Sequence, residues 1–158
     1  MARIFITGST DGLGRGAARV LMDEGHEVVL HARTRQRAAA LSGLAAGAWN
    51  AAQAYAESKL QVTALALTLA RAWPQVLSNA VDPGWVPTKM GGPAATGVLE
   101  LGYLTQTWLA ASNDTAATVS GGYWYHRQRR EPAAQARDPA FQNQLMDRLA
   151  ALTGVTLP

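Results

Sequence analysis

One stretch decides the fold of this chain: Arg3-Ile4-Phe5-Ile6-Thr7-Gly8-Ser9-Thr10-Asp11-Gly12-Leu13-Gly14. Its first four residues form a short apolar run rich in strand-forming side chains, and helix formers occupy positions 17–22 after the glycines. A strand, a glycine turn and a helix in this order can cradle a phosphate group, because the unsatisfied N–H groups of the new helix point at it. The sequence therefore predicts a phosphate-binding turn.

The glycines of this turn have separate tasks. We expect Gly8 to allow the tight turn, Gly12 to let the backbone approach a pyrophosphate, and Gly14 to let the helix pack closely on the strand. Gly25 suits the end of that helix, and the apolar run at 27–31 is expected to form a second buried strand. These segments together make a β-α-β unit of the usual size.

The residues after the second strand indicate which nucleotide binds. A protein that prefers NAD places Asp or Glu there, because a carboxylate accepts hydrogen bonds from the ribose hydroxyls. This chain instead has Arg33, whose planar charged fork suits a 2′-phosphate, and Arg35 and Arg37 add to the positive field. The sequence therefore favours NADP(H) over NAD(H). The alternative is compositional, since the chain has only two lysines and nearly all its basic residues are arginines.

A second segment opens at 48–50 and continues as a long apolar helix that ends near Trp73, because Pro74 cannot continue it. Tyr55 and Lys59 are four residues apart and should share one face of this helix. The positive charge favours the phenolate form, so the phenol can give a proton to a carbonyl oxygen as hydride arrives, or remove one from an alcohol. The alternative is an ordinary surface pair, because this spacing is common by chance.

These residues together resemble the short-chain dehydrogenase/reductase family, whose members combine Thr-Gly-x-x-x-Gly-x-Gly with Tyr-x-x-x-Lys on one Rossmann-like domain. Positions 77–82 look like the sixth strand of the family, 83–88 resemble its Pro-Gly loop at the nicotinamide end of the cofactor, and 118–125 resemble its last strand. Four motifs thus follow the family's order over nearly the whole chain. The resemblance implies an α/β, Rossmann-like three-layer fold with a reduced, mostly parallel sheet.

The resemblance also assigns site residues. It implies that Tyr55 is the catalytic acid/base and that the catalytic Lys59 holds the nicotinamide ribose. Cofactor-binding residues are implied in the glycine turn, after the second strand and in the Pro-Gly loop: Gly8, Ser9, Thr10, Gly12, Leu13, Gly14, Arg33, Pro83, Gly84, Val86 and Thr88. The substrate is then a small-molecule carbonyl or alcohol.

The spacing of the two motifs departs from the family. There the glycine turn follows strand one and the tyrosine helix follows strand five, so about 120 residues should separate them. In this chain Tyr55 is only 47 positions after Gly8. We therefore expect an internal deletion of strands three to five, with an alanine-rich helix in their place. Residues 1–158 should form a single truncated domain, in which 1–47 are the cofactor half and 48–158 the remainder.

The deletion removes residues that the family uses. No Asn-Asn-Ala-Gly run is present, and Ser42, Asn50 and Ser58 do not stand in the context of the family's substrate-polarising serine. Each lost donor is worth on the order of 3 kcal/mol of transition-state stabilisation. Two hypotheses remain: an NADP(H)-dependent oxidoreductase with weak turnover, or a non-catalytic remnant that retains at most cofactor binding or a self-associating core.

The deletion also bears on assembly. Strand one should pair with strand six, or another chain should satisfy its edge. Apolar residues are spread around the tyrosine helix, which should therefore be buried on several sides. Apolar surface that the missing elements leave uncovered predicts either self-association or poor solubility, and we expect a homo-oligomer.

Composition narrows the function further. A chain of 158 residues that is 48% hydrophobic suits one domain with a core. There is no cysteine, and the three histidines lack metal-ligand spacing, so no metal site is expected. No signal peptide or membrane span is expected, and we place the protein in the cytoplasm. The net charge is +3, but the basic run at 126–130 has no nucleic-acid motif and is expected to be a solvated turn.

Three further segments complete the expectations. Positions 91–97 are expected to be a flexible stretch where the family carries its substrate loop, and 132–139 an alanine-rich connection. Positions 141–152 should form a closing amphipathic helix, with Phe141, Leu145, Leu149 and Leu152 in the core.

Overall fold

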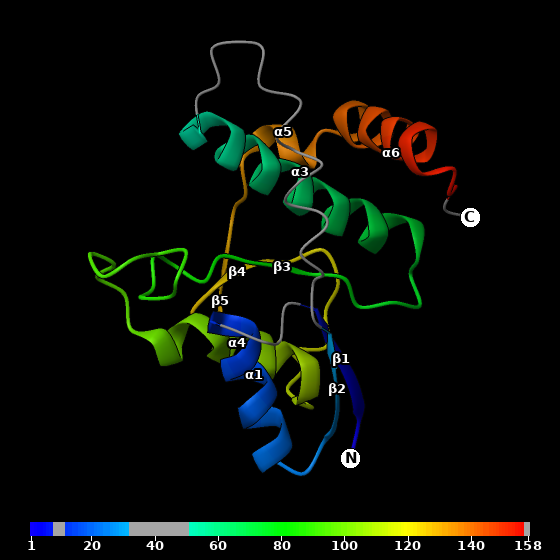
Figure 1. Ribbon diagram of the computed structural model, residues 1–158. Helices are drawn as coiled ribbons and strands as arrows, with labels where there is room; N and C mark the ends of the chain where they lie inside the picture. Colours follow the sequence, from blue (N-terminus) through cyan, green and yellow to red (C-terminus); the bar gives the residue numbers. More distant parts are fainter. Residues whose placement is uncertain (8–11, 32–50, 157–158) are drawn as a thin grey trace. The chain divides into compact units, whose positions relative to one another are not determined.

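A computed structural model describes residues 1–7, 12–31 and 51–156 of the chain (Figure 1). The chain divides into two compact units that alternate along the sequence. Unit 1 takes 1–48, 81–118 and 125–128, and unit 2 takes 49–80, 119–124 and 129–158.

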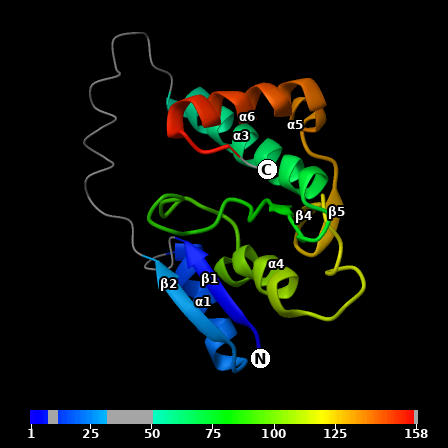
Figure 2. The ribbon, with the colours of Figure 1, turned by 90° about the vertical axis from the view of Figure 1, so that its right-hand side faces the viewer.

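Unit 1 contains the β-α-β unit that the sequence predicts. β1 (Arg3–Thr7) pairs in parallel with β2 (Glu27–His31), in a register that sets Phe5 beside Val29 (Figure 2). α1 (Gly12–Asp23) connects the two strands and ends before Gly25, whose φ is 82°. The two strands, the helix and its stop are confirmed, but β2 is not the buried strand that the sequence predicts, because Val29 is 36% exposed.

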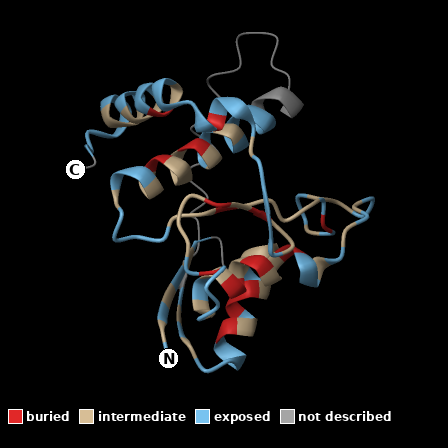
Figure 3. Cartoon of the chain, turned by 180° about the vertical axis from the view of Figure 1, so that it is seen from behind, coloured by how far each residue is buried: buried red, intermediate tan, exposed pale blue. Residues whose placement is uncertain are grey.

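A helix that the sequence did not reveal packs on α1. This is α4 (Leu99–Ala111), and a glycine from each helix lies at the contact. A Cβ added to Gly16 would lie 2.5 Å from Tyr103 Cδ1, and one added to Gly102 would lie 2.7 Å from Leu13 Cδ2. Only glycine permits this approach. Most of the buried residues of unit 1 lie on these two helices, whereas β1 and β2 have none among their described side chains (Figure 3).

A second sheet has the order β3 (Ala80–Val81), β4 (Tyr123–Tyr125) and β5 (Gln128–Arg130). β1 is not part of this sheet and pairs, among the described strands, with β2 alone. The predicted pairing of strand one with strand six is therefore not found, and the reduced sheet is split into two. The basic run at 126–130 is not a solvated turn alone, because its last three residues form β5.

The strands expected at 77–82 and 118–125 are much shorter than predicted. Next to the short strands, in unit 2, hydrogen bonds from side chains stand in place of the backbone bonds of a longer sheet. The Ser78 N–H donates to Ser120 Oγ at 3.0 Å, and Asn79 Nδ2 donates to the Val119 carbonyl at 2.7 Å. Asn79 Oδ1 also accepts from the Gly122 N–H at 2.8 Å. These groups satisfy the backbone without continuing the strands.

The turn between β4 and β5 is strained. His126 and Arg127 have φ values of 49° and 62°, in the left-handed region that residues with a Cβ seldom adopt. Contacts within unit 1 hold it: the Arg127 N–H donates to Thr105 Oγ1 at 3.0 Å, and its guanidinium lies 6.0 Å from the centre of the Trp108 ring. The His126 ring stacks on Tyr125 with centroids 3.8 Å apart. Contacts with α4 therefore stabilise the turn.

Asp114 completes this group of contacts. Trp108 Nε1 donates to its carboxylate at 2.7 Å. This hydrogen bond, with smaller contributions from Ser112 and the positive charge of Arg127, holds the pKa of Asp114 below its ordinary value of 3.8.

Unit 2 is built on the tyrosine helix, α3 (Ala51–Ala72), with α5 (Ala134–Arg137) and α6 (Pro139–Thr153) packed against it (Figure 1). Asp138 begins α6 by accepting the Ala140 N–H at 2.9 Å, and Gly154, with φ of 71°, ends it. α3 and α6 confirm two predicted helices. α5 was not predicted and occupies part of the expected connection at 132–139.

Two burial predictions for unit 2 are wrong. α3 buries Ala64 and Thr68, but Val62 is 59% exposed, so the helix is not covered on all sides. Leu152 is 73% exposed and does not join the core, because it lies in the last turn of α6.

Across the part of the chain that the structure describes, every helix is too short or too polar to cross a membrane.

The contact between Gly16 and Tyr103 predicts that the effect of Gly16→Ala on the free energy of unfolding has opposite signs with and without the Tyr103 ring. Gly16→Ala should destabilise the protein by about 1–3 kcal/mol, because the added methyl overlaps the Tyr103 ring. In a Tyr103→Ala background the same substitution should stabilise by about 1 kcal/mol, because alanine is the better helix former. Urea unfolding followed by circular dichroism measures both values. An equal effect in both backgrounds would contradict this packing.

The hydrogen bond from Trp108 to Asp114 predicts a pH effect. Trp108→Phe removes the donor, so the pKa of Asp114 should rise toward 3.8, as followed by NMR of the carboxyl carbon. A pKa lowered in the folded state gives stability above the unfolded pKa that is lost as the pH falls through the folded value. The free energy of unfolding should therefore decline below about pH 4, and less so in the variant.

Trp85→Phe is the matched control for that experiment, because the Trp85 indole donates elsewhere, to the Gly91 carbonyl at 2.9 Å. An Asp114 titration that is the same in Trp108→Phe and in the wild type would show that the hydrogen bond does not set this pKa.

Candidate functional site

Two of the predicted cofactor segments meet in unit 1, at the start of α1. Gly12 is the first residue of α1 and has φ of 52°, and a Cβ built on it would lie 3.3 Å from Thr88 Cγ2. The Thr88 side chain therefore lies directly against the glycine backbone. Together with Leu13, Lys89 and Met90, these residues line a pocket of about 300 Å³.

The segment that follows β3 takes a defined path. Asp82 Oδ1 accepts the Gly84 N–H at 2.9 Å, and Thr88 Oγ1 accepts the Gly91 N–H at 3.1 Å. Farther along, the Gly97 N–H donates to the Trp85 carbonyl at 2.8 Å. These bonds close the segment onto itself and set Thr88 beside Gly12; the flexibility expected of 91–97 stays a prediction.

The other predicted residues of this segment have mainly packing contacts. Val86 is 5% exposed, and its Cγ1 lies 3.0 Å from the position of a Cβ on Gly102. Gly84 faces the Tyr125 ring, with 3.4 Å between Cε2 and its own Cβ position, and Pro83 is half-buried. Gly14 lies half-buried in the first turn of α1. Val86 thus anchors the segment on α4.

A larger pocket of about 580 Å³ adjoins this region, between α1 and α4. Three cationic side chains line it, those of Arg15, Arg19 and Lys89, against one carboxylate, that of Asp23. This excess of positive charge favours an anionic group. Our sequence reasoning did not identify these cations, although Arg15 and Arg19 follow Gly14 at helical spacing and Lys89 follows Thr88 directly.

The predicted catalytic pair lies in unit 2. Lys59 Nζ is 5.2 Å from the centre of the Tyr55 ring, so the two side chains lie close together as their spacing predicts. Tyr55 is 54% exposed, and a reactant can reach it. Ser58 Oγ donates to the Tyr55 carbonyl at 2.7 Å, a bond within the helix, which agrees with a structural role for Ser58.

Several predicted residues lie outside the described residues: Gly8, Ser9, Thr10 and Arg33, together with Ser42 and Asn50. Their roles stay predictions. Among the residues that are described, no three His, Asp or Glu side chains are grouped so that they could hold a metal ion.

Three curated fungal proteins are similar to this chain. The short-chain dehydrogenase chry4 of Gibberella zeae matches at 24% identity over 258 positions, which cover all of this chain and 99% of the relative. An uncharacterized oxidoreductase of Emericella nidulans is 58% identical over 48 residues, 30% of this chain and 19% of that protein. The short-chain dehydrogenase chyC of Penicillium rubens is 66% identical over 38 residues, 24% of this chain and 15% of that protein.

The two shorter matches span less than a fifth of those relatives. No protein-family model and no solved structure matches the chain. The structure of this chain agrees with the full-length match, because it is an α/β fold that begins with a parallel β-α-β unit. The predicted fold class is therefore confirmed. Along its whole length the chain is similar to a short-chain dehydrogenase, which supports membership of the short-chain dehydrogenase/reductase family.

Proposed function

We propose that this protein is an NADP(H)-dependent oxidoreductase that acts on a carbonyl or alcohol substrate, with weak turnover. The observation that carries the proposal is the pair formed by Tyr55 and Lys59 on α3, in a chain whose relatives are named an oxidoreductase and short-chain dehydrogenases. An exposed phenol beside a lysine ammonium is a suitable proton donor and acceptor at a substrate oxygen.

The residues at the start of α1 fit the phosphate-bearing part of the cofactor. Gly12 leaves the space that a Cβ would fill, the N–H groups of α1 point outward there, and the first turn of the helix carries no acidic side chain. Arg15, Arg19 and Lys89 add positive charge in the adjoining pocket. A diphosphate is therefore stabilised electrostatically at this helix end.

The proposed contacts divide the cofactor among three groups of residues. By the resemblance to the family, the glycine turn, Gly8 to Gly14 with Ser9, Thr10 and Leu13, would hold the diphosphate, and Arg33 the 2′-phosphate. By the same resemblance Pro83, Gly84, Val86 and Thr88 would hold the nicotinamide end, and Lys59 its ribose. When bound, the reduced cofactor supplies the hydride.

The protein's own contribution to the reaction is a proton. The Tyr55 hydroxyl donates it to the substrate carbonyl oxygen, which becomes the alcohol, and the phenolate that remains is stabilised by the nearby ammonium of Lys59. In the opposite direction the phenolate removes the proton of an alcohol. The sequence has no position that matches the family's substrate-polarising serine. The substrate carbonyl therefore lacks one preorganised hydrogen-bond donor, and turnover should be slow.

The second candidate function is a non-catalytic remnant with an internal deletion. The full-length match to chry4 extends over 258 positions, but this chain has only 158 residues to fill them. Between β2 and α3 lie the 19 positions 32–50, whereas three β-α units need about 90 residues. Both observations favour the loss of the central strands.

We further propose a cytoplasmic homo-oligomer. Each unit leaves large apolar side chains on its surface: Met90 is 78% and Trp85 58% exposed in unit 1, and Val62 is 59% exposed in unit 2. Apolar surface of this kind is stabilised when another copy covers it.

Cofactor binding is the first requirement of the oxidoreductase proposal. Calorimetric titration should show saturable binding of NADPH, tighter than NADH by about 10–100-fold, because the 2′-phosphate gains a charge-assisted bond from Arg33. Arg33→Gln should remove this preference. Arg137→Gln is the control, because that guanidinium pairs with Glu131 in unit 2. If no saturable binding occurs at millimolar NADPH, the oxidoreductase proposal fails, and the non-catalytic remnant is the candidate function that is left.

The role of Tyr55 is tested on a protein that binds NADPH. Tyr55→Phe should lower the rate of carbonyl reduction by about 100-fold or more while leaving cofactor affinity unchanged, because only the proton donor is lost. Tyr103→Phe serves as the control, since that ring packs on Gly16. Steady-state NADPH oxidation with a panel of aldehydes and ketones measures the rates. Equal rates in Tyr55→Phe and wild type would remove the tyrosine from the mechanism.

A further inference from the structure

We propose that the groove between α3 and α6 binds a small zwitterion, with an apolar middle and with its carboxylate and ammonium groups about one helical turn apart. The groove lies wholly in unit 2 and contains neither Tyr55 nor Lys59. The proposal is therefore independent of the proposed oxidoreductase function.

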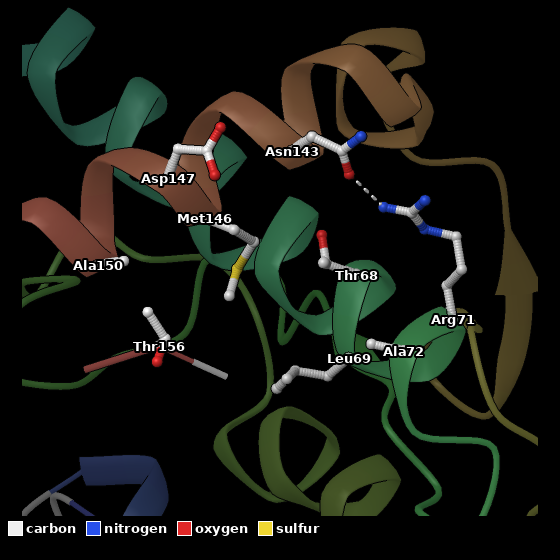
Figure 4. A pocket seen from close by; sticks show the side chains of 9 residues that line it. All are labelled: Thr68, Leu69, Arg71, Ala72, Asn143, Met146, Asp147, Ala150 and Thr156. Atoms are coloured by element: carbon white, nitrogen blue, oxygen red, sulfur yellow. Dashed lines mark hydrogen bonds between the residues drawn. The ribbon is translucent and has the colours of Figure 1, made fainter. Parts of the chain in front are cut away.

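The groove has the size of a small-molecule site. It is an open groove with a volume of about 370 Å³, within the range of ligand pockets. Its walls come from the second half of α3, one face of α6 and the chain after α6 (Figure 4). The lining residues are Thr68, Leu69, Arg71, Ala72, Asn143, Met146, Asp147, Ala150 and Thr156.

Arg71 forms the end that takes a carboxylate. Its Nη2 donates to Asn143 Oδ1 at 2.7 Å, which fixes the direction of the guanidinium (Figure 4). One of its five N–H donors is used in this bond, and a planar guanidinium can present two others to a carboxylate. No described carboxylate lies within ion-pair distance of Arg71.

Asp147 forms the end that takes an ammonium group. It lies four residues after Asn143 on α6, so the two side chains share a face and are about 6 Å apart along the helix axis. In Figure 4 Arg71 lies at one end of the groove, and Asp147 lies one turn along α6 from Asn143, the partner of Arg71, with Ala150 and Thr156 farther on. Among the described residues, Asp147 also has no ion-pair partner. The groove thus holds two opposite charges that do not neutralise each other directly.

Apolar side chains line the groove beside the two charges. They are those of Leu69, Met146 and Ala150, and the hydroxyl of Thr68 is already bonded to the Ala64 carbonyl at 2.8 Å. A ligand that packs on them gains burial of its methylene groups, worth about 0.8 kcal/mol each. An α-amino acid carries both charges on one carbon and cannot reach both ends. An ω-amino acid or a dipeptide has the required separation.

The test uses 6-aminohexanoate as the probe and the full chain labelled with ¹³C at its methionine methyl groups. The chain has four methionines, Met1, Met22, Met90 and Met146, and Met146→Leu assigns the signal from the groove. The Met146 signal should shift saturably, while those of Met22 and Met90 should not. Hexanoate and hexylamine, which carry one charge each, should bind at least about tenfold more weakly, because each leaves one end of the groove unpaired.

Charge-neutral variants test the two ends separately. Arg71→Gln and Asp147→Asn should each weaken binding by about tenfold or more, and Arg71→Gln should bring the affinity for 6-aminohexanoate down to that for hexylamine. Arg148→Gln, an exposed change on α6 outside the groove, is the matched control and should bind as the wild type does. Circular dichroism verifies that each variant is folded.

Two results would overturn the proposal. One is the absence of a saturable Met146 shift up to tens of millimolar 6-aminohexanoate. The other is equal affinity for the zwitterion and for either singly charged probe in the wild type, which decides the question even if a variant fails to fold.

Discussion

The close approach of α1 to α4 is the constraint on which unit 1 depends. It exists because Gly16 and Gly102 have no Cβ, so that Tyr103 and Leu13 can lie against the opposite helix backbone. Val86 packs against the same glycine of α4, which carries the following residues toward Gly12. The start of α1, where we propose that phosphate binds, and the Pro-Gly segment are therefore joined through a helix that contains none of the predicted site residues. Replacing Gly16 or Gly102 by a larger residue would therefore disturb the candidate cofactor site indirectly, through the packing of α1 on α4.

The same unit contains a two-stranded parallel sheet whose side chains are only partly covered. A parallel sheet is normally covered on both faces, and its strands read as continuous apolar runs. Here Phe5 is 61% and Val29 36% exposed, although they belong to such runs. The strand sequences are those of a buried sheet, but the two-stranded sheet that they form is half-covered. The apolar sequences of β1 and β2 are therefore typical of strands covered on both faces, whereas the sheet that they form here is not covered in this way.

How much could be predicted depended on how local each signal is. β1, β2, α3 and α6 follow from periodicity, Gly25 and Pro74, all within a few residues of the elements that they define. α4 was missed because its sequence contains Gly102 and three threonine or glutamine positions and lacks a polar face, and β5 because charged residues there resemble a turn. The strained turn at His126 is stabilised by α4, more than 15 residues away in sequence, and no local pattern could reveal it. The groove between Arg71 and Asp147 likewise depends on how two helices pack.

Locality also explains why the motif of the active pair is a poor guide to activity. The distance between Tyr55 and Lys59 follows from the rise of a single helix and would survive any change that leaves α3 intact. The contact of Thr88 with Gly12, in contrast, requires the tertiary structure of unit 1 to be maintained. The family's serine stands at the end of its fifth strand, and the 19 positions 32–50 are too few for three β-α units. The proposed chemistry therefore needs one relation that a single helix maintains and two that depend on tertiary structure. Under the proposed function, turnover is limited by the substrate-polarising donor and not by the proton donor.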